Sequence, residues 1–259
     1  MGAVPTITVV TATPLPNDPA APDLSIVIPA YNEAHKIARD VEAASRFLID
    51  RGLLGEVIVS DDGSGDDTAG TARACRVPEG VVLEVIAQER NRGKGAAVRA
   101  GVMASSGQYV MFADSGVCIP YDEAMRGLEL LKSGQCEIAH ASRKRADSVI
   151  VNPQPLHRRM FSRAFRLAVD VYLGLPYRLT DTQCGFKMYK GDVGRSLYGA
   201  CKTEGFLFDL EIIIRAGKAG ARIAEFPVTW SCDPDSRLRA GRTTVRTIQE
   251  LKDIKRTMR

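Results

Sequence analysis

Short apolar runs alternate with helical patterns through the first half of the chain. The runs within residues 24–31, 56–62, 82–89 and 109–114 are rich in β-branched residues and end in polar residues or proline, which predicts buried strands. Between them, apolar residues recur three or four positions apart, most clearly over residues 33–51, which predicts helices. This alternation with short loops predicts an α/β fold with a mainly parallel central sheet and helices on both faces.

The polar residues after these strands mark the predicted functional edge of the sheet. In such sheets, ligands bind beyond the carboxyl ends of the strands. Four polar clusters follow strand ends, and we expect them to meet at one pocket: Tyr31–Glu33, Asp61–Ser64, Asn91–Gly95 and Asp114–Gly116. The glycines of NRGKG would let backbone N–H groups approach a phosphate, beside the charge of Lys94. Asp114 ends a buried strand, so a positive group must meet its carboxylate.

The second half of the chain has a less regular pattern. Strands are predicted over residues 136–142 and 222–230, a basic helix over 157–173, a loop entering a strand over 181–190, and a glycine-ended helix over 208–220. Residues 1–22 contain five prolines and neither Lys nor Arg, which is typical of a mobile leader and not of a secretory signal. The domain is expected over residues 23–238, and a basic amphipathic helix over 239–259.

Composition argues against several classes of protein. No run of 18 apolar residues occurs, so no membrane-spanning helix is expected. Six cysteines without a C-x-x-C pair and three histidines without ligand spacing argue against a disulfide framework or a zinc site and suit a reducing cytoplasm. The single Trp230 and the few other aromatic residues offer no stacking platform for nucleic acid.

Positive charge is concentrated in two late segments. Residues 143–166 hold seven Lys and Arg against one Asp, and residues 235–259 hold eight against three acidic residues. This pattern indicates an anionic partner, although solvated helix faces would also produce it. The last segment spaces its apolar residues like a helix, which could lie on an anionic membrane surface, on its own domain or on a partner: Val245, Ile248, Leu251, Ile254 and Met258.

The motifs IPAYNE, VSDDGS, NRGKGAAVRAG and FAD, in this order, together resemble those of the family 2 nucleotide-sugar glycosyltransferases, which have the GT-A (Rossmann-like) fold. Downstream, ASR, DTQCGFKMY, FDLEI and EFPVTW are similar to the branch that glycosylates polyprenyl phosphates, and DTQCGFK most resembles the dolichyl-phosphate β-glucosyltransferases. The resemblance covers about residues 24–238. It implies an inverting enzyme that moves a hexose from a nucleotide sugar, UDP-glucose before GDP-mannose, to a polyprenyl or dolichyl phosphate.

The resemblance also implies roles for individual residues. Ten would bind the nucleotide sugar, through its base and ribose, its base edge or its phosphates: Pro29, Tyr31, Glu33, Val59, Asp61, Asp62, Lys94, Ala113, Asp114 and Arg237. Arg143 of ASR, with Arg158 or Arg159, would face the acceptor phosphate, and Asp114, Arg143 and Arg159 would be the catalytic residues. The acceptor phosphate is already an anionic nucleophile, so no general base is required.

Asp114 matches the first residue of the family's D-x-D motif, whose carboxylates hold Mg²⁺ or Mn²⁺ against the donor diphosphate. Position 116 is glycine, so one carboxylate is missing. Diphosphate oxygens and water could complete the shell, or Asp122 or Asp209 could reach it. Two alternatives therefore stay open beside the metal-dependent lipid-phosphate transferase: a transferase with a soluble acceptor, and a non-catalytic nucleotide-sugar-binding homologue. Peripheral attachment at the cytoplasmic face of a membrane, through this chain, a membrane-anchoring partner or a homo-oligomer, is expected.

Overall fold

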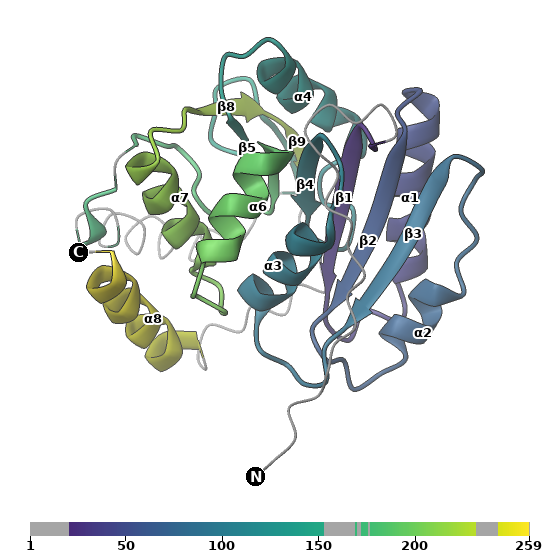
Figure 1. Ribbon diagram of the computed structural model, residues 1–259, viewed down its shortest axis with the longest axis horizontal. Helices are drawn as coiled ribbons and strands as arrows, with labels where there is room; N and C mark the ends of the chain where they lie inside the picture. Colours follow the sequence, from purple (N-terminus) through teal and green to yellow (C-terminus); the bar gives the residue numbers. More distant parts are fainter. Residues whose placement is uncertain (1–20, 153–168, 170–171, 176, 232–242, 259) are drawn as a thin grey trace.

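The computed structural model describes residues 21–152, 169, 172–175, 177–231 and 243–258, and the side chains of the last range from Thr247 onward (Figure 1). Nearly all of the predicted leader and of the basic helix over 157–173 lie outside the described residues. So do three predicted site residues, Arg158, Arg159 and Arg237. The structure therefore addresses the strand-end clusters and Arg143, but not these three arginines.

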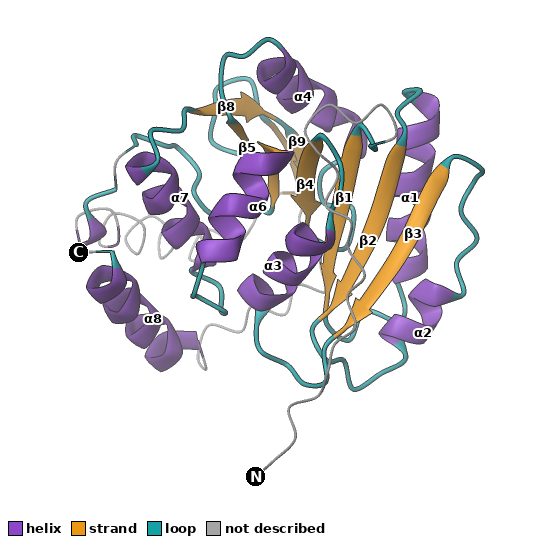
Figure 2. Cartoon of the chain, in the orientation of Figure 1, coloured by secondary structure: helices purple, strands orange, loops and turns teal. Residues whose placement is uncertain are grey.

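The central sheet has seven strands in the order β3-β2-β1-β4-β7-β5-β8 (Figure 2). The strands are β1 (Leu24–Ala30), β2 (Gly55–Asp61), β3 (Val81–Ala87), β4 (Tyr109–Ala113), β5 (Ile138–Ser142), β7 (Phe186–Lys190) and β8 (Ile223–Pro227). Strands β1 to β4 are parallel, as are β5 and β8. Strand β7 is antiparallel to both of its neighbours, β4 and β5. The predicted mainly parallel sheet is confirmed, with β7 as its exception.

Helices cover both faces of this sheet, as predicted (Figure 1). The helices of the described residues are α1 (Ile37–Asp50), α2 (Thr68–Arg73), α3 (Lys94–Ala104), α4 (Ala124–Lys132), which follows the short 3-10 helix η1 (Tyr121–Glu123), α6 (Gly191–Ala200), α7 (Phe208–Lys218) and α8 (Thr243–Thr257). All but α8, which packs beside α7, lie on a face of the sheet. Successive residues of a strand point to opposite faces. In β1, Ile26 packs in the core cluster that holds α1, α2 and α4, whereas Val27 packs in the cluster that holds α3, α6 and α7.

The ends of β1, β2 and β3 are level, the parallel strand β4 ends close to them, and this positions the site. Ala30 of β1 pairs with Asp61 of β2, and Asp61 pairs in turn with Ala87 of β3. Strand β4 pairs with β1 up to the Val27–Phe112 pair. The loops that follow β1, β2 and β4 therefore leave the sheet at the same edge. A separate two-stranded sheet joins β6 (Val149–Asn152) and β9 (Thr229–Ser231).

Helix α8 packs partly on its own domain. Ile254 is 1% exposed and lies in a cluster with Leu207, Leu210 and Ile214. Ile248, on the same helix, is 47% exposed. Among the described residues, no helix is long and apolar enough to cross a membrane. At least one side of α8 therefore packs on its own domain, which is one of the three surfaces predicted for this helix.

A buried carboxylate on α1 supports the turn after β4. Asp40 is 1% exposed, and its Oδ2 accepts a hydrogen bond of 2.7 Å from the backbone N–H of Gly116. Burial raises the pKa of Asp40 to about 6, although the Gly116 N–H group and the nearby Arg39 and Lys36 act in the opposite direction. The folded protein therefore favours a protonated Asp40 more than the unfolded chain does.

This shift predicts a pH dependence of stability. Because the pKa of Asp40 is higher in the folded state than in the unfolded state, its contribution weakens as the pH rises from about 4 through 6 and is constant above about 7. We expect a loss of about 2 kcal/mol between pH 4 and 8 from this group. Urea unfolding of the wild type and of Asp40→Asn at several pH values should show a flatter profile for the variant. Parallel profiles would contradict the assignment.

The packing of α8 predicts contrasting effects of two alanine substitutions. Ile254→Ala should lower the free energy of unfolding by about 2–4 kcal/mol because it empties a buried site. Ile248→Ala, on the exposed side of the same helix, should change it by less than about 0.5 kcal/mol. Denaturant unfolding measures both values, and equal effects would show that α8 does not pack through Ile254.

Candidate active site

The loops after β1 and β2 are joined to one another. The backbone N–H of Asn32 donates to Ser64 Oγ, and that of Gly65 donates to Asn32 Oδ1, both at 2.7 Å. Asn32 has φ +51°, a left-handed conformation that asparagine tolerates better than most residues. The backbone N–H of Glu33 donates to Thr68 Oγ1 at 2.7 Å. The first two predicted clusters thus form one continuous wall.

Asp61 and Asp62, both buried, have different partners. The carboxylate of Asp61 accepts hydrogen bonds from the hydroxyl and the N–H of Ser64, within its own loop. The carboxylate of Asp62 accepts the backbone N–H groups of Arg92 at 2.9 Å and Gly93 at 2.8 Å. Asp62 therefore anchors the basic glycine loop before α3, a role that sequence reasoning did not assign to it.

The backbone N–H groups of this loop are already engaged. Besides the two that Asp62 accepts, the N–H of Gly95 donates to the carbonyl of Gly205 at 3.2 Å, and that of Ala96 to the carbonyl of Glu204 at 3.1 Å. The prediction that backbone N–H groups of this loop receive a phosphate is wrong for these four. What the loop presents to the site is the side chain of Lys94.

Asp114 meets Lys94. The Lys94 Nζ lies 2.6 Å from Asp114 Oδ1. Beneath this pair, Lys187 Nζ lies 2.7 Å from Asp209 Oδ1, with both side chains buried. The two ammonium groups lie 5.8 and 5.4 Å from the centroid of the Phe112 ring. Burial alone would lower the pKa of Lys94, but the carboxylates of Asp114 and Asp209 outweigh it and raise that pKa, so the lysine stays charged.

Gly185, in the DTQCGFK motif, fixes the position of Asp114. The backbone N–H of Asp114 donates to the Gly185 carbonyl at 2.8 Å. A Cβ atom added to Gly185 would lie 2.0 Å from Asp114 Oδ2, closer than any van der Waals contact allows. Only glycine at this position leaves the carboxylate where it is.

The turn after Asp114 is shaped for glycine at position 116. Gly116 has φ +103°, a conformation that an aspartate adopts only with strain. Asp122 does not replace the missing carboxylate, because it pairs with Arg51 at 2.7 Å. Asp209 lies near Asp114 but is paired with Lys187. Among the described residues, no three His, Cys, Asp or Glu side chains gather as a metal cage.

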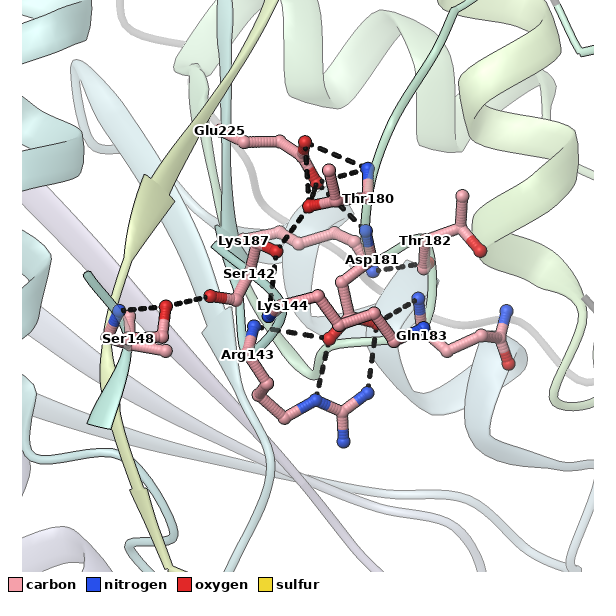
Figure 3. A network of polar contacts seen from close by, with 11 residues as sticks. Ser142, Arg143, Lys144, Ser148, Thr180, Asp181, Thr182, Gln183, Lys187 and Glu225 are labelled. Carbon is pink, nitrogen blue, oxygen red and sulfur yellow. Dashed lines mark hydrogen bonds and ion pairs between the residues drawn. The ribbon is translucent and has the colours of Figure 1, made fainter. Parts of the chain in front are cut away.

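Arg143 is held in a network of polar contacts (Figure 3). Its Nε lies 2.7 Å from Asp181 Oδ2 and its Nη2 lies 3.0 Å from Asp181 Oδ1, the bidentate geometry that suits a guanidinium. The guanidinium also lies over the Trp230 ring, 5.5 Å from its centroid. Although burial alone would raise the pKa of Asp181, the Arg143 charge lowers it to about 2.

Glu225 on β8 fixes the loop that carries Asp181. Its carboxylate accepts the backbone N–H groups of Thr180 and Asp181 at 2.9 Å. Sequence reasoning missed both acids as anchors, although each stands in a motif that it used: Asp181 begins DTQCGFK and Glu225 begins EFPVTW. The signal that could have identified these anchors was an acidic residue inside an otherwise apolar or turn-forming stretch.

The structure brings most of the predicted site residues to one edge. Pro29, Val59 and Ala113 are buried near the ends of β1, β2 and β4, and Tyr31 is 40% exposed beyond β1. Glu33 pairs with Lys36, with 2.9 Å between Oε2 and Nζ. Contacts link the four clusters in sequence: the first loop to the second, the second to the basic loop, and Lys94 to Asp114.

Comparison with known proteins agrees with this architecture. A family model described as glycosyl transferase family 2 matches residues 25–193. Dolichyl-phosphate beta-glucosyltransferase from Dictyostelium discoideum is 29% identical over 244 residues, which cover 90% of this chain and 73% of that protein. The protein of the same name from Homo sapiens is 29% identical over 232 residues, 85% of this chain and 71% of its own. Glycosyltransferase AglD from Haloferax volcanii is 30% identical over 223 residues, but they cover only 35% of AglD.

Solved structures share the fold. Glucosyl-3-phosphoglycerate synthase from Mycobacterium tuberculosis, in complex with Mn²⁺, UDP and glucosyl-3-phosphoglycerate, aligns with a TM-score of 0.56 and 21% identity over 92% of this chain and 77% of that one. Staphylococcus aureus TarS 1–349, in complex with UDP-GlcNAc, aligns with a TM-score of 0.60 and 17% identity over 91% and 66%. Both have the GT-A fold. These alignments show the fold, and the family model that matches residues 25–193 shows that this chain belongs to glycosyl transferase family 2.

Proposed function

We propose that this chain transfers glucose from UDP-glucose to a polyprenyl or dolichyl phosphate, with inversion at the anomeric carbon. The observation that carries the proposal is the pairing of Lys94 with Asp114, 2.6 Å apart, at the edge where Glu33 and Asp61 also lie. The sequence relatives named dolichyl-phosphate beta-glucosyltransferase support the sugar and the acceptor class.

The donor would lie along the wall formed by the first two loops. Tyr31 and Glu33 would contact the base and ribose, since a carboxylate accepts hydrogen bonds from hydroxyl groups, and Asp61 would accept from an N–H on the base edge. Lys94, a charged lysine at the end of this wall, would approach the diphosphate. Pro29, Val59 and Ala113 supply the buried backbone under these groups.

The transfer itself forms one bond and breaks one. An oxygen of the acceptor phosphate attacks the anomeric carbon of glucose, and the bond from that carbon to the diphosphate oxygen breaks. UDP departs with the electron pair. Because the acceptor is an anion before it reacts, the chain need supply no base. Its task is to hold two anionic groups together, to which the charged Lys94 and Arg143 would contribute.

The residues fit a divalent cation held mainly by the substrate. Mg²⁺ commonly uses one or two carboxylates with substrate phosphates and water, and Asp114 supplies one carboxylate. When bound, Mg²⁺ or Mn²⁺ would neutralise charge on the departing diphosphate. Lys94 already neutralises Asp114 without the ion. Because position 116 carries no second carboxylate, the site would take positive charge both from Lys94 and from the bound cation.

A peripheral position at the cytoplasmic face of a membrane follows from the lipid acceptor. Helix α8 packs on its own domain through Ile254 but keeps Ile248 47% exposed, so one side of the helix is available to a membrane surface or a partner. A water-soluble acceptor and a protein that binds nucleotide sugars without turnover are the rival functions.

Transfer assays test the proposal directly. We expect labelled glucose to pass from UDP-glucose to a short isoprenoid phosphate, faster with Mg²⁺ or Mn²⁺ than with a chelator, and not to the corresponding alcohol. GDP-mannose should be a poorer donor. UDP binding by calorimetry separates the rivals: binding without transfer to any acceptor would support the non-catalytic homologue, and no binding would reject the donor site itself.

Gly185 offers a sharper test of the Asp114 geometry. Gly185→Ala should lower kcat/KM for glucose transfer at least about tenfold, because the new Cβ displaces the Asp114 carboxylate, and tenfold corresponds to about 1.4 kcal/mol. Gly199→Ala is the matched control, because its Cβ would meet nothing closer than Met103 Sδ at 3.6 Å. Thermal unfolding should show both variants folded. Equal kcat/KM values for the two variants would show that the position of the Asp114 carboxylate does not affect the reaction.

A further inference from the structure

A cavity of about 510 Å³ lies beside the strand-end site. Its described lining comes from the residue after Arg143 and from the segment before β7: Lys144, Leu175, Tyr177, Arg178, Leu179, Thr180 and Thr182. The same segment continues to Gly185, which touches Asp114. The cavity therefore adjoins the place where the donor diphosphate would lie without coinciding with it.

The charged side chains that line this cavity are all cationic. Lys144 and Arg178 are both exposed, and no acidic residue is among the described lining residues. Within the described part of the chain, no ion pair engages Arg178. The acid next to the lining, Asp181, is committed to the Arg143 guanidinium. The described lining brings two cationic side chains together and holds no acidic one, and this positive charge favours an anion.

The wall of the cavity is held in place before any ligand arrives. The Thr180 hydroxyl lies 2.6 Å from Ser142 Oγ and donates to Glu225 at 3.0 Å (Figure 3). The carbonyl of Thr182 accepts a hydrogen bond of 3.2 Å from the buried Lys187. A wall fixed in this way loses little conformational entropy when a ligand binds.

Apolar side chains form the remainder of the lining. Leu175, Tyr177 and Leu179 are each partly buried. Leu175 packs against the cluster that includes α8, and Tyr177 packs against the core under α7 and donates its hydroxyl to the carbonyl of Ala221. A small polar acceptor would gain nothing from these surfaces, whereas an isoprenoid chain would bury apolar area against them.

We propose that this cavity binds the phosphate monoester end of a lipid acceptor, with Lys144 and Arg178 on the phosphate and Leu175, Tyr177 and Leu179 along the first part of the chain. The assignment rests on the proposed function for its reaction partner. It makes Lys144 and Arg178 acceptor-binding residues, the first of them next in the chain to Arg143, whose guanidinium is fixed by Asp181.

Charge-removing variants test the cationic half of the proposal. Lys144→Gln and Arg178→Gln should each raise the KM for citronellyl phosphate about tenfold or more, the loss expected for one charge-assisted hydrogen bond. The KM for UDP-glucose should stay unchanged. Arg76→Gln is the control, because Arg76 is equally exposed but lies between α2 and β3. Both test residues are exposed, so thermal unfolding should match the wild type.

Ligand variation tests the apolar half without disturbing the fold. Calorimetry on the UDP-bound protein should give citronellyl phosphate the highest affinity, with methyl phosphate and inorganic phosphate weaker and citronellol undetectable. Equal affinities of the three phosphates would overturn the lipid assignment and leave a site for free phosphate. The two variants should weaken all three phosphates, and Arg76→Gln none of them.

Failure of this inference differs from failure of the proposed function. If the wild type transfers glucose but Lys144→Gln and Arg178→Gln behave as Arg76→Gln does, the cavity is not the acceptor site and the function stands. If UDP neither binds nor reacts, the function fails. Calorimetry with citronellyl phosphate in the absence of UDP, on the wild type and on the two variants, would then still decide whether the cavity holds a lipid phosphate.

Discussion

The ion pair between Lys94 and Asp114, 2.6 Å apart, is the interaction on which the strand-end site depends. A carboxylate at the tip of a buried strand needs a compensating charge, and the chain supplies it from a different element. Lys94 begins α3, and the loop before it is fixed by the Asp62 carboxylate at the end of β2. The partner of the residue that follows β4 is thus positioned by the end of β2, so the geometry of the pair depends on where both strands end.

The antiparallel strand β7 completes this arrangement. Because it runs against β4, it begins at the edge where β4 ends, so the loop before it arrives beside Asp114 and not at the far side of the sheet. The last residue of that loop, Gly185, leaves space for the carboxylate, and Lys187 reaches under the site to Asp209. Breaking such a buried pair by removing one partner typically costs about 3–5 kcal/mol, which ties the position of β7 to the stability of the fold.

Sequence patterns predicted the parallel half of the sheet, most clearly β1 and β2, because these two strands are covered on both faces. All seven residues of β1 and of β2 are buried, and such strands are continuous apolar runs. The direction of β7 was not predictable, since the alternation in FKMYK is the same whichever way a strand runs. Nor could the sequence show that the carbonyls of Glu204 and Gly205 take the N–H groups at the start of α3, because these residues lie far apart in the chain.

The distribution of cations suits the two anions of the proposed reaction. Lys94 and Arg143 each have a carboxylate partner, Asp114 and Asp181, so each is held in place but brings little net charge. Two fixed pairs alone would not offset a diphosphate and a phosphate monoester at close range. On the proposed function, the further charge would come from groups without such partners, which is the situation of Arg178 within the described residues, and from a cation bound with the donor. Lys94 and Arg143 would thus orient the substrates, whereas Arg178 and the cation would neutralise their charge.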